Sequence, residues 1–351
     1  MSDDFIAALC ERVRDHAARK APLRIRGGGS KDFYGQSCSG EGVELSPYAG
    51  IVAYEPRELV VTVRAGTPLA ELESALAAER QMLPFEPPHF GERATIGGAV
   101  ASGLSGPRRP YAGSVRDFVL GTRVVNGKGE DLSFGGRVIK NVAGYDVSRL
   151  MAGALGTLGV ITEISFKVLP RPARETTLVF ELDEEEATEQ ANRWAGQPLP
   201  LSATSWHEGK LRVRLSGAAT AVAAAKVKMG GEEMEAGDYW RELREQRLAF
   251  FSGARPLGRL SVPQTAAPIR TAHPQLLEWG GGVRWVSGDL DPMNIRSTAE
   301  RLGGHATLFR GGDKSIGVFH PLQPALMKIH RRLKDAFDPA GILNPGRMYD
   351  F

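Results

Sequence analysis

The chain of 351 residues is long enough for two domains, and its composition, 42% hydrophobic and 24% charged, is that of an ordinary globular protein. A net charge of +3 with both signs interspersed gives no case for nucleic-acid binding. Two cysteines, Cys10 and Cys38, cannot frame a disulfide scaffold and suit a reducing compartment. The acidic and then amphipathic N-terminus is unlike a secretory signal, and no apolar stretch reaches the roughly 18 residues of a membrane helix. We therefore expect a cytoplasmic protein.

The first 170 residues are predicted to form strands and helices that end at the Pro-Arg-Pro of residues 170–172, where we place a domain boundary. Thr67 is expected to N-cap a helix, with Pro68 in its first turn. Asn126-Gly127 is expected to make a hairpin turn. In chain order, the expected elements are a helix over 3–19, strands over 23–26, 50–56 and 58–67, a helix from 68 onward, a hairpin within 117–134, a helix over 147–155 and a strand over 159–169.

Beyond that boundary, strands alternate with helices in a second region. Such a succession fits an α+β layer, with helices on one face of an antiparallel sheet. A last helix, with Leu322, Leu326, Ile329 and Leu333 on one face, leads to a tail that we expect to return to the first domain. The expected elements are strands over 176–183, 210–217, 259–264 and 283–290 and helices over 183–196, 216–230, 292–304 and 322–336. We therefore divide the chain into residues 1–170, 171–320 and 321–351.

Two glycine-rich loops are the most informative features of the sequence, one over residues 26–31 and the other over residues 95–121. Glycine lets the main chain approach a ligand closely, and consecutive N–H groups in such a turn form a nest for anionic oxygens. The alternative for each loop is a tight turn without a ligand. Together they indicate two walls of a cleft for a large phosphate-bearing cofactor. A Rossmann fingerprint and a P-loop do not fit, because no helical pattern follows Gly27-Gly28-Gly29 and no Ser or Thr closes the nearest P-loop candidate.

Hydrolytic and metal-binding motifs are absent from the sequence. The seven histidines are scattered, with no His-x-x-x-His pair and no Cys/His quartet. No Gly-x-Ser-x-Gly elbow occurs. We therefore expect no metal site.

Three motifs together resemble the FAD-binding oxidoreductases of the vanillyl-alcohol oxidase type, also called the p-cresol methylhydroxylase fold. They are the loop over residues 27–31, the Thr-Ile-Gly-Gly string over residues 95–98 and the Gly-Thr-Leu-Gly-Val-Ile-Thr string over residues 156–162. The tail over residues 338–347 is similar to that of the 2-hydroxyacid dehydrogenase branch. The resemblance implies an α+β fold, with a two-subdomain FAD-binding domain and a smaller cap domain built on an antiparallel sheet.

The resemblance also implies which residues contact FAD. The first loop corresponds to the pyrophosphate-binding loop, residues 95–106 to the segment along the flavin and diphosphate, and residues 159–161 to contacts with the adenine and ribose. A Lys-Asn-x-x-Gly-Tyr-Asp string over residues 140–146 is expected to shape the pocket. The implied cofactor-binding residues are Arg26, Gly27, Gly28, Gly29, Ser30, Lys31, Thr95, Ile96, Gly97, Gly98, Ser102, Gly103, Gly106, Gly113, Arg116, Asp117, Gly159, Val160 and Ile161.

Departures from the family pattern define the expected role. Covalent members carry a histidine in the first loop, where this chain has Ser30, so FAD is expected to be bound non-covalently. The branch that oxidises lactate or glycolate carries a His-Gly-Asp-Gly-Asn-x-His-like string in its second domain. This chain has no such string, and we therefore assign no catalytic residue.

Over its whole length the chain is similar to the FAD-binding subunits of bacterial glycolate oxidases. That resemblance implies an accessory or electron-relaying subunit of a complex that oxidises glycolate to glyoxylate. Its implied partners are a sister FAD-containing catalytic subunit and an iron–sulfur subunit. Contact with the inner membrane is expected only through these partners.

Two alternatives stay open. The first is a self-sufficient flavin dehydrogenase of another alcohol or 2-hydroxyacid, for which His320, His89, Tyr145 and Arg310 are the candidate residues. The second is a scaffold whose FAD site is vestigial. The tryptophans of the second domain belong either to a docking surface or to the core, and they are Trp194, Trp206, Trp240, Trp279 and Trp285.

Overall fold

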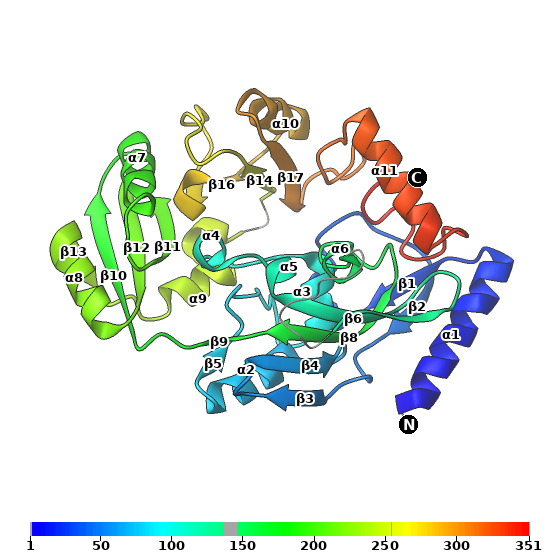
Figure 1. Ribbon diagram of the computed structural model, residues 1–351. Coiled ribbons are helices and arrows are strands. Elements are labelled where there is room, and N and C mark those ends of the chain that lie inside the picture. The colour runs from blue at the N-terminus through cyan, green and yellow to red at the C-terminus, as the bar shows by residue number, and fades with distance from the viewer. Residues whose placement is uncertain (1, 137–145, 254, 351) are drawn as a thin grey trace.

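The computed structural model describes residues 2–136, 146–253 and 255–350, and its elements form two layers (Figure 1). The lower layer in that view contains a five-stranded sheet and the upper layer an eight-stranded sheet. Neighbouring strands in both sheets are antiparallel. The predicted α+β class is therefore confirmed.

The lower layer is built on a sheet with the strand order β3-β4-β8-β6-β7. Its central strand β8 (Val160–Lys167) is almost wholly buried, which explains why its sequence is a continuous apolar run rather than an alternating one. The other strands are β3 (Ile51–Glu55), β4 (Val60–Arg64), β6 (Val119–Val125) and β7 (Asp131–Gly135), with the short pairs β1 (Leu23–Arg26) and β2 (Glu41–Glu44), and β5 (Gln81–Met82) and β9 (Leu169–Pro170). The helices are α1 (Ser2–Arg19), α2 (Leu69–Ala78), α3 (Ile96–Ser102), α4 (Arg109–Ala112), α5 (Val115–Phe118) and α6 (Val147–Leu150).

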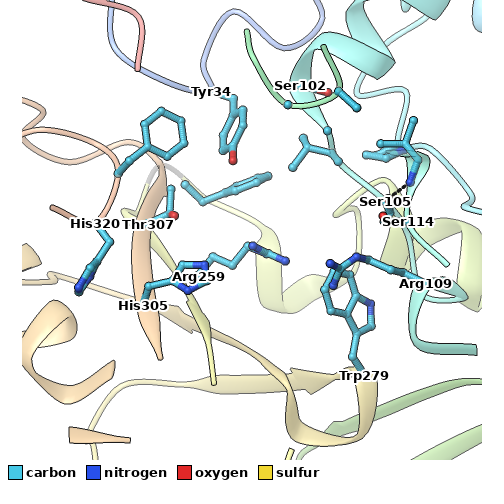
Figure 2. A pocket seen from close by; sticks show the side chains of 18 of the residues that line it. Tyr34, Ser102, Ser105, Arg109, Ser114, Arg259, Trp279, His305, Thr307 and His320 are labelled. Carbon is cyan, nitrogen blue, oxygen red and sulfur yellow. Dashed lines mark hydrogen bonds between the residues drawn. The ribbon is translucent and has the colours of Figure 1, made fainter. Parts of the chain in front are cut away.

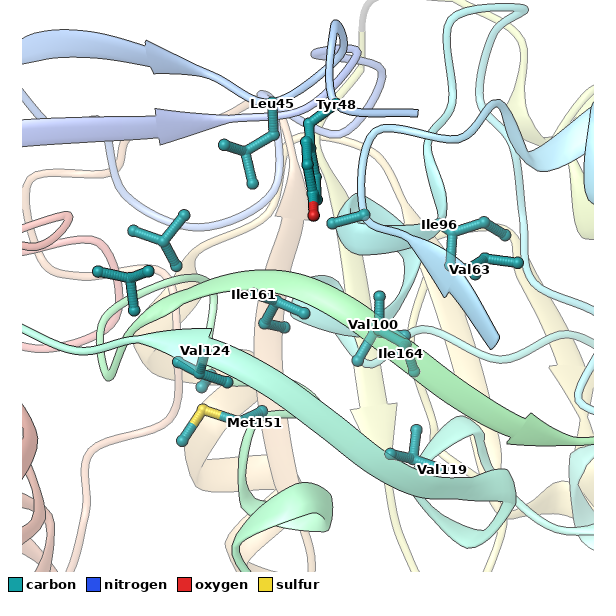
Figure 3. Packing of buried hydrophobic residues seen from close by; sticks show 14 of the residues in the cluster. Leu45, Tyr48, Val63, Ile96, Val100, Val119, Val124, Met151, Ile161 and Ile164 are labelled. Carbon is teal, nitrogen blue, oxygen red and sulfur yellow. The ribbon is translucent and has the colours of Figure 1, made fainter. Parts of the chain in front are cut away.

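The core of the lower layer fixes the second glycine-rich loop (Figure 3). Ile96 and Val100 of α3 are buried in one cluster with Ile161 and Ile164 of β8. The sequence predicted a loop here, but its first part is a helix, because Ile96 and Val100 are four residues apart and supply one apolar face. Thr95 caps this helix, and its hydroxyl accepts a hydrogen bond from Gly98 N at 3.3 Å.

Thr67 does not cap α2, contrary to the sequence prediction. Pro68 holds the N-cap position and makes no side-chain cap. The Thr67 hydroxyl is fully buried, where it donates to Arg64 O at 2.7 Å and accepts from Gly50 N at 2.9 Å. A buried hydroxyl takes the partners that the core offers, and here these lie in the preceding strands.

The upper layer is an eight-stranded sheet with the order β13-β10-β12-β11-β15-β16-β14-β17. Helix α7 begins with a capping box between Asp183 and Glu186, as its sequence pattern favours. The strands are β10 (Arg174–Glu181), β11 (Leu201–His207), β12 (Lys210–Gly217), β13 (Glu232–Met234), β14 (Leu257–Ser261), β15 (Gln275–Glu278), β16 (Val283–Ser287) and β17 (His305–Arg310). The helices are α7 (Glu184–Ala195), α8 (Ala219–Met229), α9 (Tyr239–Arg244) and α10 (Pro292–Arg301), with short 3₁₀ turns η1 (Ala249–Phe251) and η2 (Trp279–Gly281).

The tryptophans belong to the interior of this layer. Trp194, Trp240, Trp279 and Trp285 are buried. Trp206 is half-buried, and its indole donates to Leu182 O at 2.8 Å. Of the two alternatives, core packing is therefore the one observed, and no docking surface is formed by these side chains.

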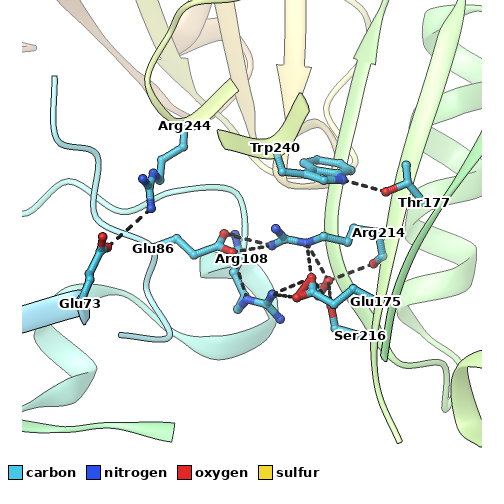
Figure 4. A network of polar contacts seen from close by, with 10 residues as sticks. Glu73, Glu86, Arg108, Glu175, Thr177, Arg214, Ser216, Trp240 and Arg244 are labelled. Atoms are coloured by element: carbon cyan, nitrogen blue, oxygen red, sulfur yellow. Dashed lines mark hydrogen bonds and ion pairs between the residues drawn. The ribbon is translucent and has the colours of Figure 1, made fainter. Parts of the chain in front are cut away.

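A buried network of ion pairs joins the two layers (Figure 4). Glu86 of the lower layer accepts from Arg108 Nε at 3.2 Å and pairs with Arg214 Nη2 of β12 at 2.9 Å. Arg108 also reaches Glu175 of β10 at 3.1 Å. Both guanidinium groups are buried, so their charges depend on these carboxylates. The network holds the eight-stranded sheet over the lower layer and thereby fixes the space between them.

The last helix, α11 (Pro324–Phe337), leads into a tail that runs back along the lower layer. Lys334 is buried, and its ammonium group contacts Asp338 Oδ2 at 2.6 Å, Thr157 O at 2.8 Å and Leu343 O at 2.9 Å. The apolar stripe expected on this helix is only partly buried, since Leu333 packs against the core of the lower layer while Leu326 and Ile329 are about half exposed at 49% and 51%.

Candidate functional site

The first glycine-rich loop packs so closely on the second that side chains are excluded from it. A Cβ atom at Gly27 would lie 2.3 Å from Thr95 Oγ1, and one at Gly28 would lie 1.4 Å from Arg93 O. Gly29 has a φ of +75°, in the left-handed region that favours glycine. The sequence therefore needs glycine at these positions for close packing and for the turn itself.

The main chain of this loop presents free donors. Among the residues that the structure describes, the N–H groups of residues 27–31 meet no hydrogen-bond acceptor of the protein. They border a cavity of about 110 Å³, which we call the turn cavity. Consecutive unpaired N–H groups make a nest for anionic oxygens, so the structure favours the anion-binding interpretation over that of a plain turn.

Four basic residues line the turn cavity: Arg24 and Arg26 are paired with Asp32, and the other two are Lys31 and Arg347. Lys31 Nζ lies 3.2 Å from His89 O, and burial lowers the pKa of this ammonium group to about 8. Arg347 lies in the tail, and its guanidinium donates to Gln36 O at 2.6 Å. A phosphate group next to Lys31 would favour its charged form, which burial disfavours.

A larger cavity of about 880 Å³ adjoins the first one and lies between the two layers (Figure 2). We call it the interlayer cavity. Ser102, at the end of α3, lines both cavities, so a single elongated ligand can extend from one into the other. One wall is the main chain of residues 102–107, and the facing wall is formed by side chains of the eight-stranded sheet, such as Trp285 and Thr307.

The wall on the sheet side carries ionisable groups. Glu278 is buried and accepts a hydrogen bond from Trp285 Nε1 at 2.7 Å. Burial raises the pKa of its carboxyl to about 7, although the bond from Trp285 and the charge of Arg259 lower it. Burial also lowers the pKa of His305, with a smaller contribution from Arg259. The Glu278 carboxyl can therefore exchange a proton near neutral pH.

The predicted site residues fall into three groups. Those that line the turn cavity are Arg26, Gly27, Gly28, Gly29, Ser30, Lys31, Thr95, Gly97, Gly98, Ser102, Gly159 and Ile161. Those that line the interlayer cavity are Ser102, Gly103, Gly106 and Arg116. Ile96 and Val160 are core residues, Gly113 precedes α5, and Asp117 forms a capping box with Ser114. The string over residues 140–146 lies outside the described residues except for Asp146.

Sequence reasoning missed both the tail and the sheet wall. Asn344 lines the turn cavity, accepts from Ile25 N and donates to Leu155 O, each at 2.7 Å. The Asn-Pro-Gly-Arg string over residues 344–347 was the available signal for it. Arg109 and Arg259 of the interlayer cavity had no signal, because they come from distant segments.

The residues named for a self-sufficient dehydrogenase are separated in the structure. His320 lines the interlayer cavity, and its Nε2 lies 3.2 Å from Glu300 Oε1. His89 pairs with Glu73 at 2.9 Å, and Arg310 donates to Gln246 at 2.7 Å. Tyr145 lies outside the described residues.

Neither a metal site nor a membrane-spanning helix is formed by the described residues. Within residues 2–136, 146–253 and 255–350, no group of three or more His, Cys, Asp or Glu side chains is placed to hold a metal ion. In the same part of the chain, no helix is both long enough and apolar enough to span a membrane.

Comparison with known proteins agrees with the geometry. A family model described as an FAD binding domain matches residues 6–135, and one described as the C-terminal domain of FAD linked oxidases matches residues 319–348. Among solved structures, an alkyldihydroxyacetonephosphate synthase superposes with a TM-score of 0.67 at 15% identity, over 96% of this chain and 74% of that one. The predicted FAD-binding fold of the p-cresol methylhydroxylase type and the prediction of FAD as cofactor are thereby confirmed.

Two relatives of this chain are named as glycolate oxidase subunits. The glycolate oxidase subunit GlcE of Escherichia coli (strain K12) is 49% identical over 99% of this chain and 98% of its own length. The glycolate oxidase subunit GlcD of Bacillus subtilis (strain 168) is 32% identical over 53% of this chain and 39% of its own length.

Proposed function

Because this chain belongs to the family of FAD-linked oxidases that contains the glycolate oxidase subunit GlcE of Escherichia coli, we propose that it is the FAD-binding subunit of a complex that oxidises glycolate to glyoxylate. The observation that carries the proposal is the pair of adjoining cavities, with free N–H donors at one end and a wide space between the layers at the other. That shape suits a dinucleotide whose diphosphate and ring system need different surroundings.

The residues present fit FAD. The free N–H groups of residues 27–31, with Lys31 and Arg347, suit the two phosphates. The main chain of residues 102–107 leaves room for the flat ring in the interlayer cavity. When bound there, the flavin supplies the capacity to accept a hydride and release electrons. The protein's own part is to hold the ring, to exclude water and to position a substrate.

Non-covalent binding is supported by the side chains around the first loop. Ser30 stands where covalent members of the family have histidine. His89, whose carbonyl contacts Lys31 of this loop, has its imidazole paired with Glu73 at 2.9 Å. We therefore infer that acid precipitation releases the flavin into the supernatant.

An accessory or electron-relaying role is supported by two observations. This chain lacks the His-Gly-Asp-Gly-Asn-x-His-like string, and its relatives GlcE and GlcD are both named as subunits of a glycolate oxidase. The proposed partners are a sister flavoprotein that carries that string and an iron–sulfur subunit, and contact with a membrane would be made through them. Leu326 and Ile329 of α11 are half-exposed, and Leu326 lines the interlayer cavity. We further propose the domain limits 1–170, 171–320 and 321–351.

The experiment that tests this proposal is co-expression of the chain with its two proposed partners, one of them tagged. We expect a complex that contains all three chains and reduces an artificial acceptor dye when glycolate is added. Omission of this chain should abolish that activity. The proposal fails if the purified chain holds no flavin, or if the other two subunits oxidise glycolate equally well without it.

A further inference from the structure

Two arginines of the interlayer cavity have no anionic partner. Arg109 of α4 and Arg259 of β14 both line this cavity, one from each layer (Figure 2). Within the described residues, neither guanidinium group has an ion pair or hydrogen bond, whereas the adjacent Arg108 pairs with both Glu86 and Glu175. Arg259 is half-buried, and a half-buried cation without a counter-ion is costly, so its retention calls for an explanation, whereas Arg109 is exposed.

Both guanidinium groups lie against the same indole. The Trp279 ring centroid is 4.5 Å from Arg109 Cζ and 5.1 Å from Arg259 Cζ. Contact with the face of the indole ring lowers the energetic cost of removing each guanidinium group from water. They are close enough to repel each other, since Arg259 contributes to the lowered pKa of Arg109, after burial. An anion bound between them would relieve this repulsion.

Trp279 adds a second independent sign of a ligand. This side chain is 92% buried, and within the described structure its indole N–H has no acceptor. Its backbone also has a φ of +60°, which is unusual for a bulky residue. Strained residues of this kind cluster at binding sites.

The acidic residue next to Trp279 does not fill the place of the missing counter-ion. Glu278 forms no ion pair with Arg109 or Arg259 in the described structure, and its carboxyl is held by Trp285 Nε1 at 2.7 Å. Burial raises its pKa to about 7, so its negative charge is incomplete at neutral pH. The cavity wall stays positive overall because four arginines line it against two glutamates, and they are Arg109, Arg116, Arg244 and Arg259 against Glu278 and Glu300.

We propose that Arg109 and Arg259, stacked on Trp279, bind the carboxylate of a small organic acid in the interlayer cavity of this chain. The site faces the main chain of residues 102–107, so the acid would lie between the arginines and the flavin. The choice of a two-carbon acid such as glycolate or glyoxylate rests on the proposed function, whereas the anion site itself rests on the unpaired cations alone. The subunit would then sense or hold the acid itself, without the catalytic string of its sister.

The test is titration of the purified, flavin-loaded chain with glyoxylate, followed by the change in flavin absorbance and by calorimetry. Wild type should show saturable binding, and glycolamide, which lacks the charge, should not bind. We expect Arg259→Met and Arg109→Met each to weaken glyoxylate binding about tenfold or more, since each removes a charge-assisted contact. Arg259→Lys should recover part of the affinity.

The control is Arg57→Met, which removes an exposed arginine of the β3–β4 turn and should bind glyoxylate as wild type does. Circular dichroism and flavin content identify any variant that is misfolded. Because Arg109 is exposed, its replacement should not disturb the fold, so Arg109→Met still tests the site if Arg259→Met misfolds. The inference is wrong if flavin-loaded wild type shows no saturable binding, or if both variants bind like Arg57→Met. Either result leaves the proposed function intact, which fails instead on loss of flavin or of complex activity.

Discussion

Replacement of Gly98 by alanine tests the turn cavity without disturbing the fold. A Cβ atom at this position would have one neighbour within 4 Å, Thr95 Oγ1 at 3.2 Å. Gly98 lines the turn cavity, so the added methyl group would enter the space assigned to FAD. The backbone of Gly98 is helical, and it needs no glycine for its conformation.

The structure predicts opposite effects on stability and on binding. Alanine is favoured over glycine within a helix by about 1 kcal/mol, and slight crowding at Thr95 offsets part of that gain. The free energy of unfolding of the FAD-free chain should therefore change by less than about 1 kcal/mol. One extra methyl group in a cavity of only about 110 Å³ should cost about 1–3 kcal/mol of binding energy. That cost corresponds to FAD binding that is about five- to 150-fold weaker.

The assay compares urea denaturation of the FAD-free chain with FAD titration of the same sample. The matched control is Gly196→Ala after α7, where φ is −78° and the new Cβ would meet no atom closer than 3.7 Å. This control should leave FAD affinity unchanged. Wild-type FAD affinity in Gly98→Ala would refute the assignment of the turn cavity.

Three further predictions concern buried charges. Glu86→Gln removes the carboxylate shared by Arg108 and Arg214 and should lower the free energy of unfolding by about 3–5 kcal/mol in urea titration; an unchanged midpoint would contradict the role of the network. Lys334→Met leaves Asp338 buried without its cation and should lower the melting temperature, whereas Lys328→Met on the exposed side of α11 should not. Burial raises the pKa of Glu278 from 4.5 to about 7, so the folded chain binds this proton more tightly than the unfolded chain. The free energy of unfolding of the wild type should therefore fall as the pH rises from 4.5 to about 7. Glu278→Gln should remove this pH dependence, so its free energy of unfolding should gain about 2–3 kcal/mol relative to wild type between about pH 5 and pH 8. Parallel plots of unfolding free energy against pH for the two proteins would disprove the pKa shift.

The close-packed glycine turn, to which we assign the phosphates, could be predicted from the sequence because its packing requirements are local. Gly27 and Gly28 stand where any Cβ would meet Thr95 Oγ1 or Arg93 O, and such positions accept only glycine. Gly97 and Gly98 hid helix α3, since glycine argues against a helix and the decisive Ile96 and Val100 act through the core. Local chemistry was visible in the sequence, and tertiary packing was not.

The opposite wall of the interlayer cavity could not be predicted, because the register of the eight-stranded sheet creates it. Arg259 and Trp279 are brought together by the pairing of β14 with β16 and of β16 with β15, and Arg109 reaches them from the other layer. Arg108 and Arg109 are neighbours of the same type, yet one is buried in ion pairs and the other faces the cavity. No sequence pattern distinguishes two such residues.

The hydrogen bond from Ile25 N to Asn344 Oδ1 joins residues 319 positions apart at the turn cavity. During synthesis on the ribosome, the glycine turn emerges long before Asn344 and Arg347 exist, so the growing chain cannot yet close this cavity. Capture of the flavin nucleotide is therefore expected only after Asn344 and Arg347 have been synthesised, with folding of the first residues proceeding without it. Cellular shortage of riboflavin would then affect the finished protein and spare the nascent one.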